Sequence, residues 1–468
     1  MGTRYVTYGI QFLASMLIAF QLGPEKFGIW SFFLLIVNFF NIFDFGISNS
    51  LNVLLVQDRN NKERYFGHIK SALLLTAAVS LTVLLLLFLE KAFRFKIIDK
   101  YNIQPYLLVT VIIVVTAYFN KIFAAIYRVR NKLAEVALYQ SIIPVFLFVS
   151  IMSIKDNILY FLIISYLVGN LISFFVFIFR KEISLKGKAS YGNVKQIGSK
   201  GFWLFLYNSS FYFILYLSSF LVSLSYTVSE YGKYNFSYTL SHAVILLIDA
   251  FGFIIFPKMI AKLKDNDMEK NEKTIEYIRI NYMTIVHLLV FLAFPLFYLL
   301  NMCFPQYSNT TCALCLAGLA LLPYADCFGL NTFLIAQNRE KLLSAISILS
   351  LLFNTVFVMF SIYFLKLSFE YIFICISISY CIYTLSCAVM VSKMLNKRVD
   401  VVSVLQYAFI NQNVFVFVLS VLIAIFYHDN IFILCLPLLT YSILNFERVR
   451  IVYNSFKQVI LKPNIVDL

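Results

Sequence analysis

Long apolar runs recur along the whole chain, and they constrain its fold more than any other feature. The hydrocarbon core of a bilayer is about 30 Å thick, so a helix needs about 20 mostly apolar residues to cross it. Fourteen segments meet or approach this length, roughly 5–22, 29–56, 71–89, 105–126, 136–154, 158–179, 202–224, 236–257, 280–300, 311–335, 343–364, 371–391, 414–427 and 431–446. They predict an all-α integral membrane protein with about 14 transmembrane helices.

The composition excludes the water-soluble classes. Of the 468 residues, 61% are hydrophobic and 13% are charged, whereas soluble domains are about 45–50% apolar and about 25% charged. A soluble enzyme, a secreted disulfide scaffold and a disordered chain are therefore excluded. A second apolar run follows the N-terminal one at once, so we interpret the first run as a retained helix and not as a cleaved signal.

The positive charge alternates between the two sides of the expected spans. The net charge is +15; the loops on one side, with Arg4, hold 29 of the 38 Lys and Arg residues, and the loops on the other side hold 8. Cytoplasmic loops carry such an excess, so both termini are predicted to be cytoplasmic. This topology explains the basic charge, and no nucleic-acid partner is expected.

Two short sequence matches indicate an internal repeat. Residues 25–30 resemble 229–234, and residues 119–125 resemble 330–336. Both pairs lie six spans apart, so the two halves share an orientation and are related by an axis along the membrane normal. We expect two six-helix bundles related by a parallel pseudo-two-fold, with two further C-terminal helices. The motif glycines Gly28 and Gly232 are interpreted as tight-turn positions.

The spans and the repeat together predict the domain organisation. The expected parts are an N-terminal six-helix bundle (1–179), a cytoplasmic linker (180–201), a C-terminal six-helix bundle (202–391), a second cytoplasmic linker (392–413), helices 13 and 14 (414–446) and a cytoplasmic tail (447–468). A cavity between the two bundles would allow alternating access by rocking.

The repeat motifs also carry a resemblance to a known family. The stretches Leu22–Trp30, Asp44–Ile47 and Asn331–Lys341 resemble bacterial polysaccharide flippases. These are the O-antigen (Wzx-type) translocases of the superfamily that includes MATE-type exporters and peptidoglycan-precursor flippases. The resemblance implies that an undecaprenyl-diphosphate-linked oligosaccharide is moved from the cytoplasmic to the periplasmic face of a bacterial inner membrane.

The same resemblance implies the wider setting of the activity. The oligosaccharide unit would serve O-antigen, lipopolysaccharide or other surface polysaccharide synthesis. Related exporters couple transport to ion entry, which makes H⁺ or Na⁺ the expected coupling ion, with no other cofactor. Membrane lipids surround the protein, and a polysaccharide polymerase is a compatible partner.

Polar groups inside the N-terminal spans are the first candidates for function. A central Asp, Lys or Arg costs at least about 2.5–3.5 kcal/mol in a membrane. Asn38, Asn41 and Asp44 are spaced by three and form a polar stripe on one helical face, which we expect to line a cavity; the alternative is a polar clamp between helices. Lys121 either extends its ammonium toward the interface or binds the anionic diphosphate.

Further candidates lie in the second half or at span ends. Asp249 occupies the helix that matches the Asp44 helix, with a local cap as the alternative. Asp326 follows Pro323, where a broken helix would expose carbonyls beside a carboxylate, and is the candidate H⁺ or Na⁺ coupling residue. Arg128 and Arg339, at cytoplasmic span ends, could bind the headgroup, although topology alone also places basic residues there.

Histidine and cysteine give weaker signals. His242 and His287 are interpreted as packed neutral side chains. All eight cysteines lie in the C-terminal half, where we interpret them as small packing residues. Cys312 and Cys315 have a CxxC spacing without a second pair, so no metal site is expected. Cys303 and Cys312 flank a short outer loop in which they could pair.

Two rival functions are weighed against the flippase. A MATE-type cation-coupled exporter of small molecules would share the fold; Lys121, Arg128 and Arg339 favour an anionic substrate, whereas the intramembrane acids weaken that argument. A polymerase should carry a sizeable outer loop, and the longest expected here has about 15 residues. The DxD-like stretch Asp265–Asp267 lies in a charged loop with no nucleotide-binding pattern around it. The sequence therefore favours a flippase over an enzyme.

Overall fold

The computed structural model consists of helices joined by short turns. It describes residues 2–58, 61–93, 96–180, 183, 187–243, 263 and 268–461, and no strand occurs among them. This confirms the all-α prediction. The internal contacts divide the chain into unit 1, Met1–Asn235, and unit 2, Phe236–Leu468. The expected bundle boundaries at 179 and 202 rest on the repeat instead, and they stay a prediction.

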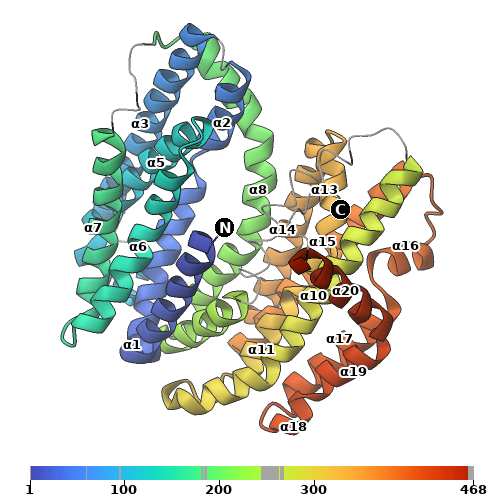
Figure 1. Ribbon diagram of the computed structural model, residues 1–468. Coiled ribbons are helices and arrows are strands. Elements are labelled where there is room, and N and C mark those ends of the chain that lie inside the picture. The colour runs from blue at the N-terminus through green and yellow to red at the C-terminus, as the bar shows by residue number, and fades with distance from the viewer. Residues whose placement is uncertain are drawn as a thin grey trace. The chain divides into compact units, whose positions relative to one another are not determined.

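Unit 1 is a group of long helices that run side by side (Figure 1). Helix α6 packs against α1 and α7, and α5 packs against α2, α3 and α7. A further helix is described over residues 228–243. The labelled elements are α1 (Gly2–Ile42), α2 (Ile47–Gln57), α3 (Lys62–Phe93), α4 (Lys96–Lys100), the 3₁₀ turn η1 (Gln104–Tyr106), α5 (Leu107–Val129), α6 (Leu133–Ser153), α7 (Ile158–Phe179) and α8 (Tyr191–Ser225).

Helix α1 contains two of the expected spans. A straight helix of its 41 residues would be about 60 Å long, twice the thickness of the hydrocarbon core. Gly23 breaks it with φ 69° and ψ 171°, and Pro24 follows. Only glycine adopts such a positive φ readily, so the Gly-Pro pair separates the two arms of α1.

Asparagine ends many of the other helices. Asn102, Asn131, Asn157, Asn309, Asn338 and Asn396 all have a positive φ between 49° and 70°. Asparagine tolerates this left-handed conformation because its short polar side chain bonds locally to the backbone. The turns between the apolar runs are therefore defined by single residues in the sequence.

Two glycines of the repeat bring helices into backbone contact. A Cβ added at Gly232 would lie 1.9 Å from the carbonyl oxygen of Pro24, and one at Gly28 would lie 2.2 Å from the carbonyl oxygen of Val228. Both glycines lie inside helices, so their interpretation as tight-turn positions is wrong. The two motif segments therefore touch each other, while the repeat itself stays a prediction.

Unit 2 surrounds a broken central segment. Most of the residues in Thr311–Ala336 are buried, and the segment is divided into three short helices. The labelled elements are α10 (Met268–Cys303), η2 (Pro305–Tyr307), α11 (Thr311–Ala320), α12 (Leu322–Asp326), α13 (Phe328–Ala336), α14 (Glu340–Tyr363), η3 (Phe369–Tyr371), α15 (Ile372–Met394), α16 (Val401–Ala408), α17 (Asn411–Phe426), α18 (Ile431–Leu434), α19 (Leu436–Leu444) and α20 (Phe446–Leu461).

Nine helices among the described residues are long and apolar enough to cross a membrane. The number rises to 11 if each bent pair is one span, with a bend of 72° between α16 and α17 and of 80° between Ile431–Leu444 and Phe446–Asn454. The chain is therefore a multi-pass membrane protein. The expected span 236–257 is described only as far as 243, and the count of 14 spans stays a prediction.

Cationic side chains satisfy the carbonyl groups at two helix ends. The ammonium of Lys100 donates to the carbonyl oxygens of Ser223, Leu224 and Tyr226, at 2.7, 3.1 and 2.6 Å, where α8 ends. Burial lowers the pKa of Lys100, and the nearby carboxylate of Glu230 acts in the opposite direction.

The second such cation is Arg279, which lies buried on α10 in unit 2. It donates to the carbonyl oxygens of Tyr407 and Ala408, at 2.7 and 2.8 Å, where α16 ends. Its side chain passes over Gly329 on α13, where an added Cβ would lie 2.5 Å from its Cγ. The last carbonyls of a helix have no partner within it, so each cation removes a helix-end desolvation cost.

The glycine contact gives a direct test of the packing in unit 1. We expect Gly232→Ala to lower the free energy of unfolding by about 1–3 kcal/mol or more, because overpacking forces two backbones apart. The matched control is Gly198→Ala, since an added Cβ there meets nothing within 4 Å and alanine favours the helix by about 0.5–1 kcal/mol. Thermal unfolding of the purified protein in detergent measures both, and equal midpoints would contradict the described contact.

Candidate functional site

Unit 1 encloses a cavity of about 910 Å³. Residues of α1, α2, α5, α6, α7 and α8 line it, so the cavity is built within one unit. Much of the lining is polar: Thr7, Gln11, Ser15, Asn38, Asn41, Asp44, Ser48, Asn49, Asn52, Lys121, Arg128, Gln140 and Ser209. Aromatic rings complete it: Trp30, Tyr139, Tyr166, Phe205, Tyr212 and Tyr216. The volume is at the upper end of the range for ligand pockets, about 300–1,000 Å³.

The structure brings five of the predicted site residues together on this cavity. Asn38 and Asn41 lie in the last turns of α1, Asp44 follows in the turn to α2, and Lys121 and Arg128 lie on α5. The polar stripe is expected to line a cavity between two bundles, whereas all residues that line this cavity belong to unit 1. What these residues bind stays a prediction.

Asp44 organises a break in the helix. The expected span 29–56 is interrupted between the end of α1 at Ile42 and the start of α2 at Ile47, and Phe45 and Gly46 have φ values of 49° and 71°. The carboxylate of Asp44 accepts hydrogen bonds from the Gly46 backbone N–H at 2.9 Å and the Ser48 hydroxyl at 2.5 Å. The carboxylate thus holds the turn that precedes α2, and its negative charge lies near the N-terminus of that helix, where the helix dipole favours it.

Two side chains of α5 bind carbonyl groups in the last turn of α1, and that of Phe40 also accepts the Phe43 backbone N–H at 2.9 Å. The ammonium of Lys121 donates to the carbonyl oxygen of Asn41, and the hydroxyl of Tyr118 donates to that of Phe40. These carbonyls belong to the last turn of α1, where no N–H of the same helix follows. Lys121 therefore has a structural contact besides its place on the cavity. Its two expected roles, an ammonium at the interface or a ligand for the diphosphate, stay predictions.

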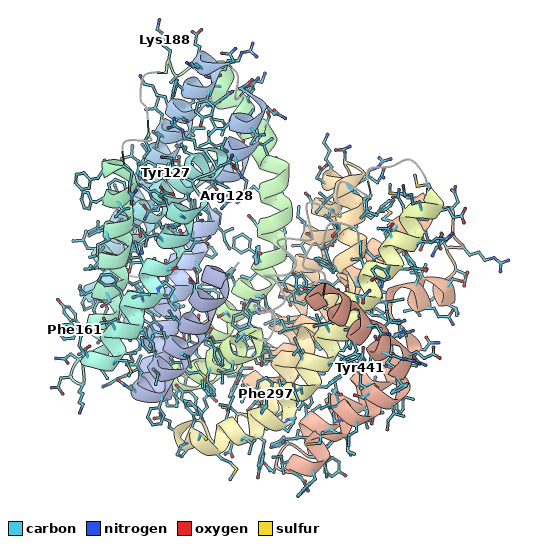
Figure 2. All side chains as sticks on the ribbon, in the orientation of Figure 1. Tyr127, Arg128, Phe161, Lys188, Phe297 and Tyr441 are labelled. Atoms are coloured by element: carbon cyan, nitrogen blue, oxygen red, sulfur yellow. The ribbon has the colours of Figure 1, made fainter. Side chains whose placement is uncertain are left out.

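Arg128 lies two turns beyond Lys121 on the same face of α5. Between them, Ala124 and Ala125 also line the cavity, and their small side chains leave room beside the two cations. Figure 2 labels Arg128 and its neighbour Tyr127. Tyr127 is buried and donates to the carbonyl oxygen of Phe177 at 2.9 Å, whereas Arg128 is exposed. Arg128 thus presents its guanidinium where a ligand can reach it.

Aromatic rings form one wall of the site. Trp30 stacks on Phe33 with centroids 5.4 Å apart, and Tyr166 meets both rings edge-on at 6.3 and 6.0 Å. Trp30 and Tyr166 both line the cavity. Interlocked rings hold their orientation, so these rings give the cavity a fixed apolar surface.

Sequence reasoning missed part of the polar lining. Asn49 and Asn52 on α2 extend the stripe of Asn38, Asn41 and Asp44 beyond the helix break, and Gln11 and Gln140 contribute from other helices. The spacing of three between Asn49 and Asn52 was a signal for a continued polar face. The two glutamines carry no such periodic signal.

Two predicted residues of the second half, Arg339 and Asp326, belong to unit 2. Arg339 precedes α14 in unit 2 and is exposed. Asp326 ends α12 in unit 2 and is buried, 4% exposed. Asp249 lies outside the described residues, as does the stretch Asp265–Asp267.

The cysteines and acidic groups form no metal centre in the part of the chain that the structure describes. All eight cysteines are free thiols, including the expected pair Cys303 and Cys312. Cys312 and Cys315 are buried on α11, together with Cys327 between α12 and α13. Their position agrees with a packing role.

The sequence also matches a family model. The model describes polysaccharide biosynthesis proteins and covers residues 17–307, more than half of the chain. The chain belongs to this family. The matched range includes the whole polar stripe, Lys121 and Arg128. No curated protein matches the chain.

Solved structures of transporters share the fold of this family member. The lipid II flippase MurJ in an inward closed conformation has a TM-score of 0.69 and 15% identity, covering 97% of this chain and 98% of that chain. An inward-facing multidrug resistance MATE family transporter of the MOP superfamily has a TM-score of 0.67 and 12% identity, covering 83% and 94%. A MOP superfamily transporter from Pyrococcus furiosus has a TM-score of 0.61 and 13% identity, covering 84% and 93%. The chain therefore has the fold of MOP superfamily transporters, as the resemblance in its motifs predicts.

The helix break predicts a stabilising role for Lys121. We expect Lys121→Met to lower the free energy of unfolding by about 1–3 kcal/mol, because the Asn41 carbonyl loses its donor. Lys121→Arg keeps a donor and should retain most of the stability. The control is Lys195→Met, an exposed lysine on α8. Thermal unfolding compares them, and a Lys121→Met midpoint equal to that of the control would rule the contact out.

Proposed function

We propose that this protein is a flippase for an undecaprenyl-diphosphate-linked oligosaccharide repeat unit. It turns the unit from the cytoplasmic to the periplasmic face of a bacterial inner membrane by alternating access, for O-antigen or other surface polysaccharide synthesis. Family membership and the transporter fold support a membrane transport role. The observation that carries the finer proposal is the cavity of unit 1, where two cations lie among amide and aromatic side chains.

The cations suit a diphosphate. A phosphate group taken out of water needs charge-assisted hydrogen bonds, and an arginine offers a planar fork that matches phosphate oxygens. Arg128 is exposed at the end of α5 and supplies this fork. Lys121 supplies a second positive charge on the same face, and the single carboxylate of Asp44 is engaged by Gly46 and Ser48. The cavity thus favours an anion.

The amides and rings suit a sugar. Hydroxyl groups both donate and accept hydrogen bonds, and asparagine and glutamine side chains do the same. Asn38, Asn49, Asn52 and Gln140 present such groups to the cavity. The C–H faces of a sugar ring are apolar and pack on aromatic rings, which the wall around Trp30 provides. The polyprenyl tail needs no protein site, because the bilayer dissolves it.

The topology and coupling complete the proposal. The excess of Lys and Arg in one set of loops supports cytoplasmic termini. Entry of H⁺ or Na⁺ would drive the change between inward-facing and outward-facing states, and no other cofactor is needed. The protein itself breaks no bond of its substrate, and a polysaccharide polymerase would receive the translocated unit.

A small-molecule exporter is the second candidate. The fold is shared with a multidrug resistance MATE transporter, and Asp44 places one acidic group on the cavity. An exporter of cationic compounds would need the carboxylate free to face its substrate, whereas both oxygens of this carboxylate accept hydrogen bonds from Gly46 and Ser48.

Deletion of the gene in its host separates the two candidates. We expect repeat units to accumulate on undecaprenyl diphosphate at the cytoplasmic face and surface polymer to be lost, both restored by the wild-type gene. Lipid-linked sugars and surface polymer are measured by extraction and immunoblotting. Unchanged polymer with greater sensitivity to toxic cations would favour the exporter instead.

Purified protein in proteoliposomes tests the cavity itself. The probe is a fluorescent undecaprenyl-diphosphate disaccharide, whose translocation is followed by the loss of its accessibility to a membrane-impermeant quencher. We expect Arg128→Gln to slow translocation by about tenfold or more, equal to about 1.4 kcal/mol, because one charge-assisted contact is lost. Arg180→Gln is the matched control, since Arg180 is an exposed arginine of unit 1 outside the cavity. Equal slowing of translocation by both variants would refute the proposal that this cavity binds the diphosphate.

A further inference from the structure

A histidine and an aspartate face each other in the interior of unit 2. Nε2 of His287 on α10 lies 3.8 Å from Oδ1 of Asp326 at the end of α12. Their side chains are 2% and 6% exposed. The separation is longer than a hydrogen bond, although both groups are polar and shielded from water.

The hydrogen bond on the other ring nitrogen fixes where the imidazole carries its proton. Nδ1 of His287 lies 2.8 Å from the carbonyl oxygen of Met283. A carbonyl oxygen only accepts, so Nδ1 is the donor. A neutral imidazole has one N–H, and Nε2 therefore points a lone pair toward Asp326.

The carboxyl group of Asp326 is unpaired on the side that faces the imidazole. Oδ1 of Asp326 is buried and has no hydrogen-bond partner among the described residues. With Asp326 ionised, two acceptors face each other in a medium of low dielectric, where unpaired polar groups are costly. One added proton turns this opposition into an Nε2–H···Oδ1 or Nε2···H–Oδ1 hydrogen bond and neutralises the charge of the pair.

A second pair in the chain shows the ordinary arrangement. Nε2 of His68 lies 2.8 Å from Oδ2 of Asp58, and Nδ1 of His68 is buried without a partner. The proton of His68 therefore sits between the imidazole and the carboxylate. The His287 pair has the opposite arrangement, with its N–H turned away from the acid.

The surroundings hold the pair in place. The ring of Tyr441 on α19 (Figure 2) stacks on the imidazole, with centroids 5.3 Å apart and planes 11° from parallel. Arg279 donates its Nε to the backbone oxygen of Asp326 at 3.3 Å and its other N–H groups to the end of α16. Among the described residues, Cys381 on α15 interacts with Asp326, and Arg448 on α20 interacts with His287. Tyr407 on α16 interacts with Arg279.

We propose that His287 and Asp326 form a binding site for one proton, held between Nε2 and Oδ1, and that proton uptake there drives the conformational change of unit 2 in the transport cycle. The proton comes from water when the site opens to one side and returns to water when it opens to the other, so no oxidant or co-reactant is needed. A hard metal cation prefers oxygen ligands, and one side of this site is a nitrogen. The coupling part rests on the proposed function, but the proton binding does not.

Asp326→Asn is the decisive variant. Its amide can donate to Nε2 and supplies the hydrogen bond that the proton would supply, so we expect the wild-type thermal stability. Infrared difference spectra of the full chain in nanodiscs, recorded across a pH titration, should show a carboxyl or imidazolium signal in the wild type. That signal should be absent in Asp326→Asn and in His287→Gln, and His68→Gln should retain it.

Transport gives the second readout. In proteoliposomes with the same fluorescent disaccharide probe, an imposed proton gradient should accelerate translocation by the wild type. The ratio of the rates with and without the gradient should fall to one in Asp326→Asn. A titrating signal that persists in Asp326→Asn, or acceleration by sodium instead of protons, would overturn the proposal. If neither the wild type nor Asp326→Asn translocates the probe, the flippase function is refuted. The infrared titration would still show whether His287 and Asp326 bind a proton.

Discussion

A peptide carbonyl in hydrocarbon has no water to bond, and each helix that ends inside a membrane protein leaves several such groups without partners. Cations meet helix ends at three places in the described chain: Lys121 at the end of α1, Arg279 at the end of α16 and, outside the apolar spans, Lys100 at the end of α8. The breaks after α1 and α16 depend on the first two contacts, because without them the breaks would leave backbone carbonyls unpaired in an apolar surrounding.

The same device shapes the cavity of unit 1. The break after α1 turns Asp44 toward the start of α2 and allows the polar stripe to continue with Asn49 and Asn52. Lys121 holds one side of the break and also lines the cavity. A polar interior is thus obtained from backbone ends and their caps, and the aromatic wall around Trp30 supplies the apolar part. The side chains that stabilise the helix break also line the cavity, so substituting them changes both the stability of the protein and the lining of the cavity.

Much of this arrangement follows from local sequence. Run length and charge alternation predict a multi-pass helical protein because they need no tertiary information, and the spacing of Asn38, Asn41 and Asp44 predicts a shared polar face. Arg279 escaped notice because it borders a charged run, and its burial is decided by α16, 128 residues away. His287 seemed a packing residue for the same reason, since its partner Asp326 comes from another helix. Contacts between distant segments carry no periodic signal.

The bends at the C-terminal end of unit 2 have a consequence for the surrounding lipid. Helix α17 has 16 residues and rises about 24 Å, which is less than the hydrocarbon thickness of about 30 Å. Ile431–Leu444 is shorter still before its bend. Such hydrophobic mismatch is relieved by local thinning of the bilayer. Helix α17 alone is therefore too short for a full crossing, so either α16 completes the span across the 72° bend or the bilayer thins at this edge of the protein.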